Sequence, residues 1–311
     1  MAKYRIVSID GGGIRGLVTT ILLQRIVATR GLENFLDSID LVAGTSTGGL
    51  LALGIAYGLD LAHIRDLYIN KGPEIFDDSW LDDLRDLGKL RGADYSIKPL
   101  RSELEKLFGD ATLGDLGKKV LITAFDLDNE DTNPAKRTWK PKLFHNFTGT
   151  NTDKAFSVVN VGLYTSAAPT YFPSVDGYID GGVFATNPSM CALAQTQDKR
   201  YKPVPDLNDI NLLSLGTGTS LQYITGKSHD WGSVKWIKPI FTLMFDGTAG
   251  IADYQCSQFL GERYHRLTPV FPASITVPMD DIRKIPYMIE FAETLVIDGT
   301  IRWLKKTWNK S

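Results

Sequence analysis

The first 57 residues contain the same local pattern twice: an apolar run, a glycine-rich turn and an apolar segment with helical spacing. Residues 4–9 are typical of a buried strand, and residues 16–29 carry apolar side chains at the spacing of a helix. The second copy has its apolar run at 39–43 and its helix at 50–57. Parallel strands joined through helices form a sheet that is covered on both faces. The pattern therefore predicts an α/β fold with a mainly parallel central sheet.

The same alternation continues along the chain. We expect further strands at 119–125, 177–180, 211–215 and 264–269, and further helices at 97–108, 154–167, 234–245, 248–260 and 282–297. The polar stretch from 128 to 142 reads as an exposed excursion, since strand-like sequence resumes on both sides of it. No repeat or low-complexity tract divides the sequence, so we expect residues 1–311 to form a single domain.

Composition narrows the classes of function. The formal net charge of −2 provides no general basic field, which argues against a nucleic-acid partner. The two cysteines, Cys191 and Cys256, form no C-x-x-C pair, so neither a disulfide framework nor a structural zinc site is expected. The sequence shows no signal peptide and no apolar run long enough to span a membrane. We expect a soluble, cytoplasmic protein of open oligomeric state.

Ser46 lies in the turn Gly44-x-Ser46-x-Gly48, between a predicted strand and a predicted helix. That context is the one a nucleophile elbow requires, because Gly44 and Gly48 allow close backbone approach while the serine hydroxyl is pushed out at the helix N-terminus. The helix dipole there also favours developing negative charge. The alternative is a small-residue turn that serves packing alone.

A serine hydroxyl needs a base, and the chain offers few candidates. By chain order, a triad of the hydrolase type would use His229 or His265, but neither histidine lies in the loop after a strand that a triad base needs. Asp180 is the better candidate. It closes a short apolar run and is followed by Gly181 and Gly182, which places its carboxylate at the sheet edge where the serine turn is expected. The alternative is an ordinary Asp-Gly turn without function.

The glycine loop from Asp10 to Gly16 has two competing interpretations. Gly11-x-Gly13-x-x-Gly16 satisfies the dinucleotide fingerprint, so a nucleotide-binding enzyme is the main rival hypothesis. The same backbone N–H groups could instead form an oxyanion hole, with Arg15 supporting the charge or anchoring a phosphate head group. The second interpretation is favoured because the second strand ends in the serine turn, for which a dinucleotide site has no use.

Taken in order, the loop Asp10–Gly16, the turn Gly44–Gly48 and the segment Asp180–Gly182 resemble the patatin-like phospholipase family. Further similar segments are 165–173, 214–218, 264–266 and 279–281, so the resemblance covers roughly residues 4–297. It implies a three-layer α/β/α sandwich.

For the chemistry, the resemblance implies a dyad of Ser46 as nucleophile and Asp180 as base, with an oxyanion hole at Gly11, Gly12 and Gly13. It implies phospholipase A or lysophospholipase activity on a lipid ester, without metal or cofactor. A non-catalytic lipid-binding protein on the same scaffold stays open as an alternative.

Two segments could govern contact with lipid. Residues 71–93 place apolar side chains on one stripe and aspartates opposite, which fits either a packed surface helix or a lid or insertion over the site. The basic, aromatic tail at 298–311 carries Trp303 and Trp308 and fits either a membrane-surface element or an end that packs its tryptophans. Transient contact with membranes or micelles, with peripheral localisation, is therefore an expectation.

Overall fold

The computed structural model describes residues 3–76, 93 and 95–308. Its main sheet consists of β1 (Tyr4–Ile9), β2 (Leu41–Thr45), β3 (Lys119–Asp126), β4 (Lys140–His145), β6 (Tyr178–Asp180), β8 (Ile210–Leu215) and β10 (Tyr264–Leu267). Two small sheets pair β5 (Thr148–Gly149) with β7 (Tyr201–Lys202) and β9 (Thr219–Ser220) with β11 (Val270–Phe271).

The α-helices are α1 (Gly16–Val27), α2 (Thr47–Tyr57), α3 (Leu61–Asn70), α4 (Gly72–Ile75), α5 (Lys98–Phe108), α6 (Val158–Ser166), α7 (Gly182–Ala185), α8 (Ser189–Thr196), α9 (Gly232–Leu260), α10 (Ile285–Thr294) and α11 (Asp298–Trp303). In the described residues, none of the helices is both long enough and apolar enough to span a membrane.

The sheet has the order β10-β8-β1-β2-β3-β4, and β6 joins it through β3. The first five strands of that order run parallel, whereas β4 and β6 run antiparallel to β3. β1 lies at the centre, with Ile9 opposite both Gly44 of β2 and Leu215 of β8. Because parallel strands at the centre are covered on both faces, they read as continuous apolar runs, and every residue of β2 and β8 is buried.

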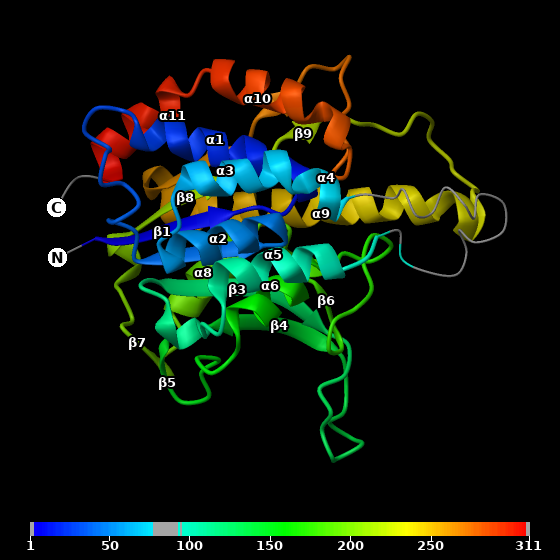
Figure 1. Cartoon of the computed structure of the whole chain (residues 1–311), viewed down its shortest axis with the longest axis horizontal. Coiled ribbons are helices and arrows are strands. Elements are labelled where there is room, and N and C mark those ends of the chain that lie inside the picture. Colours follow the sequence, from blue (N-terminus) through cyan, green and yellow to red (C-terminus); the bar gives the residue numbers. More distant parts are fainter. Residues whose placement is uncertain (1–2, 77–92, 94, 309–311) are drawn as a thin grey trace.

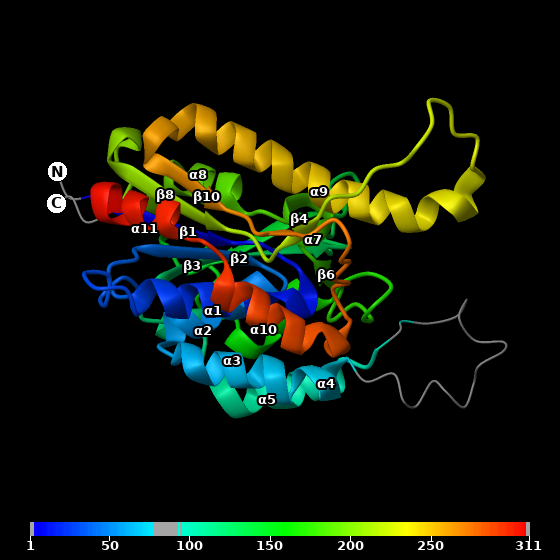
Figure 2. The ribbon, with the colours of Figure 1, turned by 90° about the horizontal axis from the view of Figure 1, so that it is seen from above.

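Helices cover both faces of the sheet (Figures 1 and 2). α1, α2, α3, α5 and α10 lie on one face, and α8 and α9 lie on the other. Alternate residues of β1 point to the two sides: Val7 and Ile9 belong to one buried apolar cluster, and Tyr4 and Ile6 to the other. This confirms the predicted three-layer α/β/α sandwich with a mainly parallel sheet.

Two helix predictions were wrong in detail. The segments 234–245 and 248–260 form one continuous helix, α9, because Asp246 and Gly247 do not stop it, and Ala252, Cys256 and Leu260 pack its later half onto the sheet. The predicted helix 282–297 is shorter, since a 3-10 turn precedes α10 and Leu295 ends it. Packing, rather than local turn propensity, sets these boundaries.

The C-terminal tail packs onto the body. Trp308 is fully buried, its ring lies 5.2 Å from that of Phe35, and its indole N–H donates to the Ser38 hydroxyl. Its carbonyl accepts a hydrogen bond from the Arg5 side chain. The structure thus favours the packed alternative for this segment. The segment 71–93 was expected to be either a packed surface helix or a lid or insertion. Its residues 77–92 lie outside the described part of the chain, and its beginning forms α4.

Candidate active site

Ser46 stands in a strained backbone conformation at the end of the second strand. Its φ is 55° and its ψ is −127°, a combination rare for a residue with a side chain. β2 ends one residue before it, and α2 begins one residue after it. A Cβ added at Gly44 would lie 2.1 Å from the Gly48 carbonyl oxygen, and one at Gly48 would lie 2.3 Å from that of Ile9. Both glycines are therefore required for the turn that presents the serine.

The topology brings Asp180 to the same place. β3 has two edges: β4 occupies one, and β2 occupies the other as far as the pair Thr45 and Thr123. β6 pairs with β3 from Ala124 onward, where Asp180 is its partner. β6 therefore continues the line of β2, and Asp180 is positioned where β2 gives way to the serine turn.

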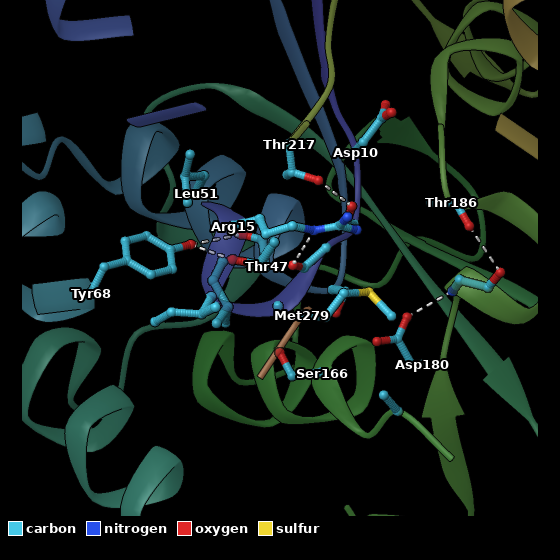
Figure 3. A pocket seen from close by; sticks show the side chains of 18 of the residues that line it. Asp10, Arg15, Thr47, Leu51, Tyr68, Ser166, Asp180, Thr186, Thr217 and Met279 are labelled. Atoms are coloured by element: carbon cyan, nitrogen blue, oxygen red, sulfur yellow. Dashed lines mark hydrogen bonds between the residues drawn. The ribbon is translucent and has the colours of Figure 1, made fainter. Parts of the chain in front are cut away.

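The environment of Asp180 raises the basicity of its carboxylate. Burial raises its pKa to about 7, while hydrogen bonding from the Ser46 side chain and the Gly182 N–H opposes the shift. The Gly182 N–H donates to Oδ1 over 2.7 Å (Figure 3). A Cβ on Gly181 would lie 2.1 Å from the Thr123 hydroxyl, so only glycine fits after the aspartate. Asp180 is thus a buried carboxylate with near-neutral pKa beside a serine.

Thr165 supports the serine from α6. Its hydroxyl accepts the Ser46 backbone N–H over 2.8 Å, which fixes the strained turn. Next to it, the buried Ser166 hydroxyl lines the pocket and lacks a hydrogen-bond partner among the described residues (Figure 3). Sequence reasoning gave neither residue a role. The only signal was that both lie in the segment 165–173 that carries the family resemblance.

The glycine loop lies against the serine turn. A Cβ placed on Gly11 would be 3.3 Å from that of Ser46. The Gly11 N–H already donates to the Thr186 carbonyl over 3.0 Å, which occupies one of the three amides predicted to form an oxyanion hole. The N–H groups of Gly12 and Gly13 have no acceptor within the part of the chain that the structure describes. They are the amides available to a ligand.

Close packing holds the loop from behind. A Cβ on Gly12 would lie 2.1 Å from the Thr217 hydroxyl, which donates to the Gly11 carbonyl (Figure 3). Gly13 has a φ of +57°, and its Cβ would lie 2.1 Å from the Met279 carbonyl oxygen. Neither position accepts a side chain unless the backbone moves.

We therefore expect Gly13→Ala to destabilise the protein by about 3 kcal/mol or more, because a positive φ and a backbone clash add together. Gly58→Ala is the matched control: Gly58 has a φ of +91° but nothing within 4 Å of an added Cβ. It should cost only about 1 kcal/mol. Urea unfolding of both variants measures the difference, and equal losses would show that the contact with Met279 carries no weight.

Two arginines shape the charge around the loop. Arg266 forms a buried ion pair with Asp10, with 2.6 Å between Nη2 and Oδ2, and also donates to Ser214. Arg15 forms no ion pair among the described residues, and its Nε donates to the Gly12 carbonyl over 3.3 Å (Figure 3). Burial lowers the pKa of Arg15, and the charge of Asp246 opposes this shift. Arg15 is therefore the cation available to an anionic ligand. Sequence reasoning gave Arg266 no role, although it lies in the segment 264–266 that carries the family resemblance.

The histidines lie elsewhere. His265 Nε2 is 2.9 Å from the Thr300 hydroxyl, and its ring stacks on Trp303. His229 stacks on Trp231, with 4.7 Å between ring centroids. All four histidines are among the described residues, and none of them lines the pocket at Ser46. A serine–histidine pair is not formed here.

A pocket of about 470 Å³ opens at Ser46 and Asp180. On one side its walls are apolar, with residues from α2, α3 and α5: Leu50, Leu51, Gly54, Ile64, Leu67, Leu100, Leu104, Leu107 and Phe108. On the other side they are more polar and include the glycine loop and one face of α9: Asp10, Arg15, Thr217, Asp246, Asp253 and Arg266. The serine lies where the two parts meet.

Comparison with known proteins decides the family. The sequence pattern described as Patatin-like phospholipase matches residues 7–228. The chain belongs to the patatin-like phospholipase family. This confirms the predicted resemblance, and the matched residues include the glycine loop, the serine turn and Asp180. Membership places the chain among lipid hydrolases.

The chain is also similar to individual proteins. The chain is 33% identical to a cGAMP-activated phospholipase of Escherichia coli, over 75% of this chain and 70% of the relative. It is 26% identical to Protein teg of Priestia megaterium, over 99% and 100% of the two chains. Among solved structures, VipD of Legionella pneumophila aligns with a TM-score of 0.44 and 14% identity, over 99% of this chain and 67% of VipD.

Proposed function

We propose that this protein hydrolyses acyl esters of phospholipids or lysophospholipids through an acyl-enzyme on Ser46, with Asp180 as the general base. The observation that carries the proposal is the pairing of the two side chains, in which a strained serine faces a buried carboxylate with a pKa of about 7. An aspartate in water, with a pKa near 3.9, would be too weak a base for this task.

The first half of the reaction forms the acyl-enzyme. Asp180 accepts the hydroxyl proton of Ser46 as Oγ attacks the ester carbonyl carbon. The carbonyl oxygen becomes an oxyanion, which the N–H groups of Gly12 and Gly13 and the N-terminus of α2 stabilise. Collapse of this intermediate breaks the bond to the alcohol oxygen, and the protonated Asp180 returns a proton to that leaving group.

The second half releases the fatty acid. Asp180 removes a proton from a water molecule, whose oxygen attacks the acyl carbonyl. The second tetrahedral intermediate expels Ser46 Oγ, which recovers its proton from Asp180. Both side chains thereby return to their starting protonation states.

The two parts of the pocket suit the two ends of a lipid. The apolar part suits the acyl chain, and the unpaired Arg15 in the polar part suits a phosphate head group. The apolar part follows α2 from Ser46 to at least Gly54, eight residues or about 12 Å along the helix axis. We further propose that the substrate is met at a membrane or micelle surface.

A larger side chain in the apolar part should shorten the acyl chains that the enzyme accepts. Leu107 lines the pocket and is only half-buried, so Leu107→Trp fills space without disturbing the centre of the core. We expect the rate on a palmitoyl ester to fall about tenfold relative to a butyryl ester. Leu127→Trp, at an exposed leucine outside the pocket, is the control and should leave the ratio unchanged. An unchanged ratio for Leu107→Trp would place the acyl chain elsewhere.

The proposal as a whole is tested by labelling. Purified protein is incubated with a fluorophosphonate probe, which reacts with activated serines, and with a fluorogenic acyl ester. We expect labelling and hydrolysis in the wild type and neither in Ser46→Ala. Labelling that persists in Ser46→Ala would assign the reactive serine to another residue.

A further inference from the structure

The first half of α9 extends beyond the body of the protein, together with the loop 221–231 that precedes it (Figures 1 and 2). This projection stands on the side where β1 and β2 end, and therefore next to the pocket. Leu221 and Gln222, at the start of the loop, are among the residues that line the pocket. The projection is thus part of the surroundings of the pocket mouth.

The two faces of α9 differ. Phe245, Asp246, Ala249, Gly250 and Asp253 line the pocket, and further along the helix Ala252, Cys256 and Leu260 are buried. Both charged residues of the helix after position 239 therefore belong to its pocket side.

The outer face is apolar and open. Ile240, Leu243, Met244, Ile251 and Tyr254 recur at helical spacing and are between 39% and 61% exposed. A continuous stripe of large, solvent-exposed apolar side chains is uncommon on a surface that binds no partner.

The loop 221–231 and the beginning of α9 have the composition of a protein surface that meets a bilayer. Tyr223 is 86% exposed, and Trp231 and Trp236 lie together with 4.9 Å between ring centroids. Between residues 221 and 245 there are three lysines and one aspartate, so the segment has a net positive charge. Aromatic rings and lysines beside an apolar stripe are the residues that interfacial helices use at the head-group level.

We propose that the outer face of α9 and the loop 221–231 form a surface that docks onto a phospholipid bilayer. A bilayer explains the combination better than a protein partner, because aromatic rings and a net positive charge accompany the apolar stripe. Docking would hold α9, whose other face lines the pocket, at the bilayer. The inference rests on the proposed function, since it takes the substrate to be a membrane lipid.

The test is flotation of the full chain with vesicles of phosphatidylcholine containing a minority of phosphatidylglycerol. Ser46→Ala is used as the parent, so that the vesicles stay intact. We expect the parent to float and the addition of Leu243→Glu and Ile251→Glu to weaken binding at least about tenfold. The matched control adds Val296→Glu, at an apolar residue that is 79% exposed but far along the chain from α9, and should float as the parent does.

Two further measurements keep the result clear. In the active protein, the pair Leu243→Glu and Ile251→Glu should lower the ratio of vesicle hydrolysis to hydrolysis of a soluble butyryl ester. If no ester is cleaved but the parent floats and the α9 variant does not, the proposed function fails and the docking surface stands. Flotation of the α9 variant equal to that of the parent overturns the surface. Light scattering provides a second check. If the parent is a dimer, the α9 variant is a monomer and both bind vesicles equally, the stripe joins two copies of the chain and the proposal is overturned.

Discussion

Ser46→Ala is expected to lower kcat/KM for acyl ester hydrolysis by at least about 10³-fold, because no other group can then form the acyl-enzyme. Removing one hydroxyl from a turn that the neighbouring glycines already define should leave the fold unchanged. Steady-state kinetics with a fluorogenic ester measure the loss, and thermal unfolding checks the fold.

Ser166→Ala is the matched control for this substitution. Ser166 is also a buried serine of the same pocket, and its hydroxyl has no partner among the described residues. We expect its removal to change kcat/KM by less than about tenfold. A Ser46→Ala enzyme that keeps full activity, or a Ser166→Ala enzyme that loses as much as Ser46→Ala, would contradict the assignment of the nucleophile.

Asp180→Asn should lower kcat/KM by about 10³-fold or more, because an amide cannot accept the serine proton.

The pH dependence of kcat/KM in the wild type tests the same role of Asp180 as the base. A base must be ionised, so kcat/KM should rise about tenfold per pH unit below the Asp180 pKa of about 7 and level off above it. Steady-state kinetics between about pH 5 and 8 measure this dependence, and a kcat/KM that does not change with pH would exclude Asp180 as the base.

The raised pKa of Asp180 also affects the pH dependence of stability. Burial raises the pKa of Asp180 from 3.8 in the unfolded chain to about 7, so the folded protein binds more protons in that window. Stability is complete below the unfolded pKa and falls as pH rises toward the folded one. Asp180→Asn removes this penalty, and should raise the free energy of unfolding by about 2–4 kcal/mol near pH 8 with little change near pH 4. Denaturant unfolding at the two pH values tests the sign, and equal effects would mean that the carboxylate is not destabilised by burial.

Local sequence patterns were sufficient to predict the fold class and the places of the serine turn and the glycine loop. The turn around Ser46 depends on contacts between residues close in sequence or on adjacent strands, and such contacts leave glycines at fixed spacing. The glycines of the first loop are spaced in the same way, although Gly13 packs against the distant Met279. The proximity of Ser46 and Asp180 was expected because both follow or close strands at the same sheet edge. The antiparallel pairing of β6 with β3, which positions Asp180, could not be predicted from the sequence.

Other features depend on partners distant in sequence. The ion pair between Asp10 and Arg266 joins residues 256 positions apart, and the only local signal at the arginine was its place in the segment 264–266 that carries the family resemblance. The Gly11 N–H donates to the carbonyl of Thr186, which is also distant in sequence, so the predicted oxyanion hole could not be narrowed to Gly12 and Gly13 from sequence. The continuity of α9 is likewise a result of packing against the sheet.

The burial of Trp308 has a consequence for how this protein can be divided. The family pattern ends at residue 228, yet β10, α10 and α11 come later, and Trp308 fills the core beside α1 and holds Arg5 at the start of β1. The residues that match the family pattern, 7–228, are thus fewer than the residues needed to form a buried core, which extend to Trp308. A recombination event that moved only residues 7–228 into another chain would transfer Ser46 and Asp180 without the later elements that help to exclude water from the core.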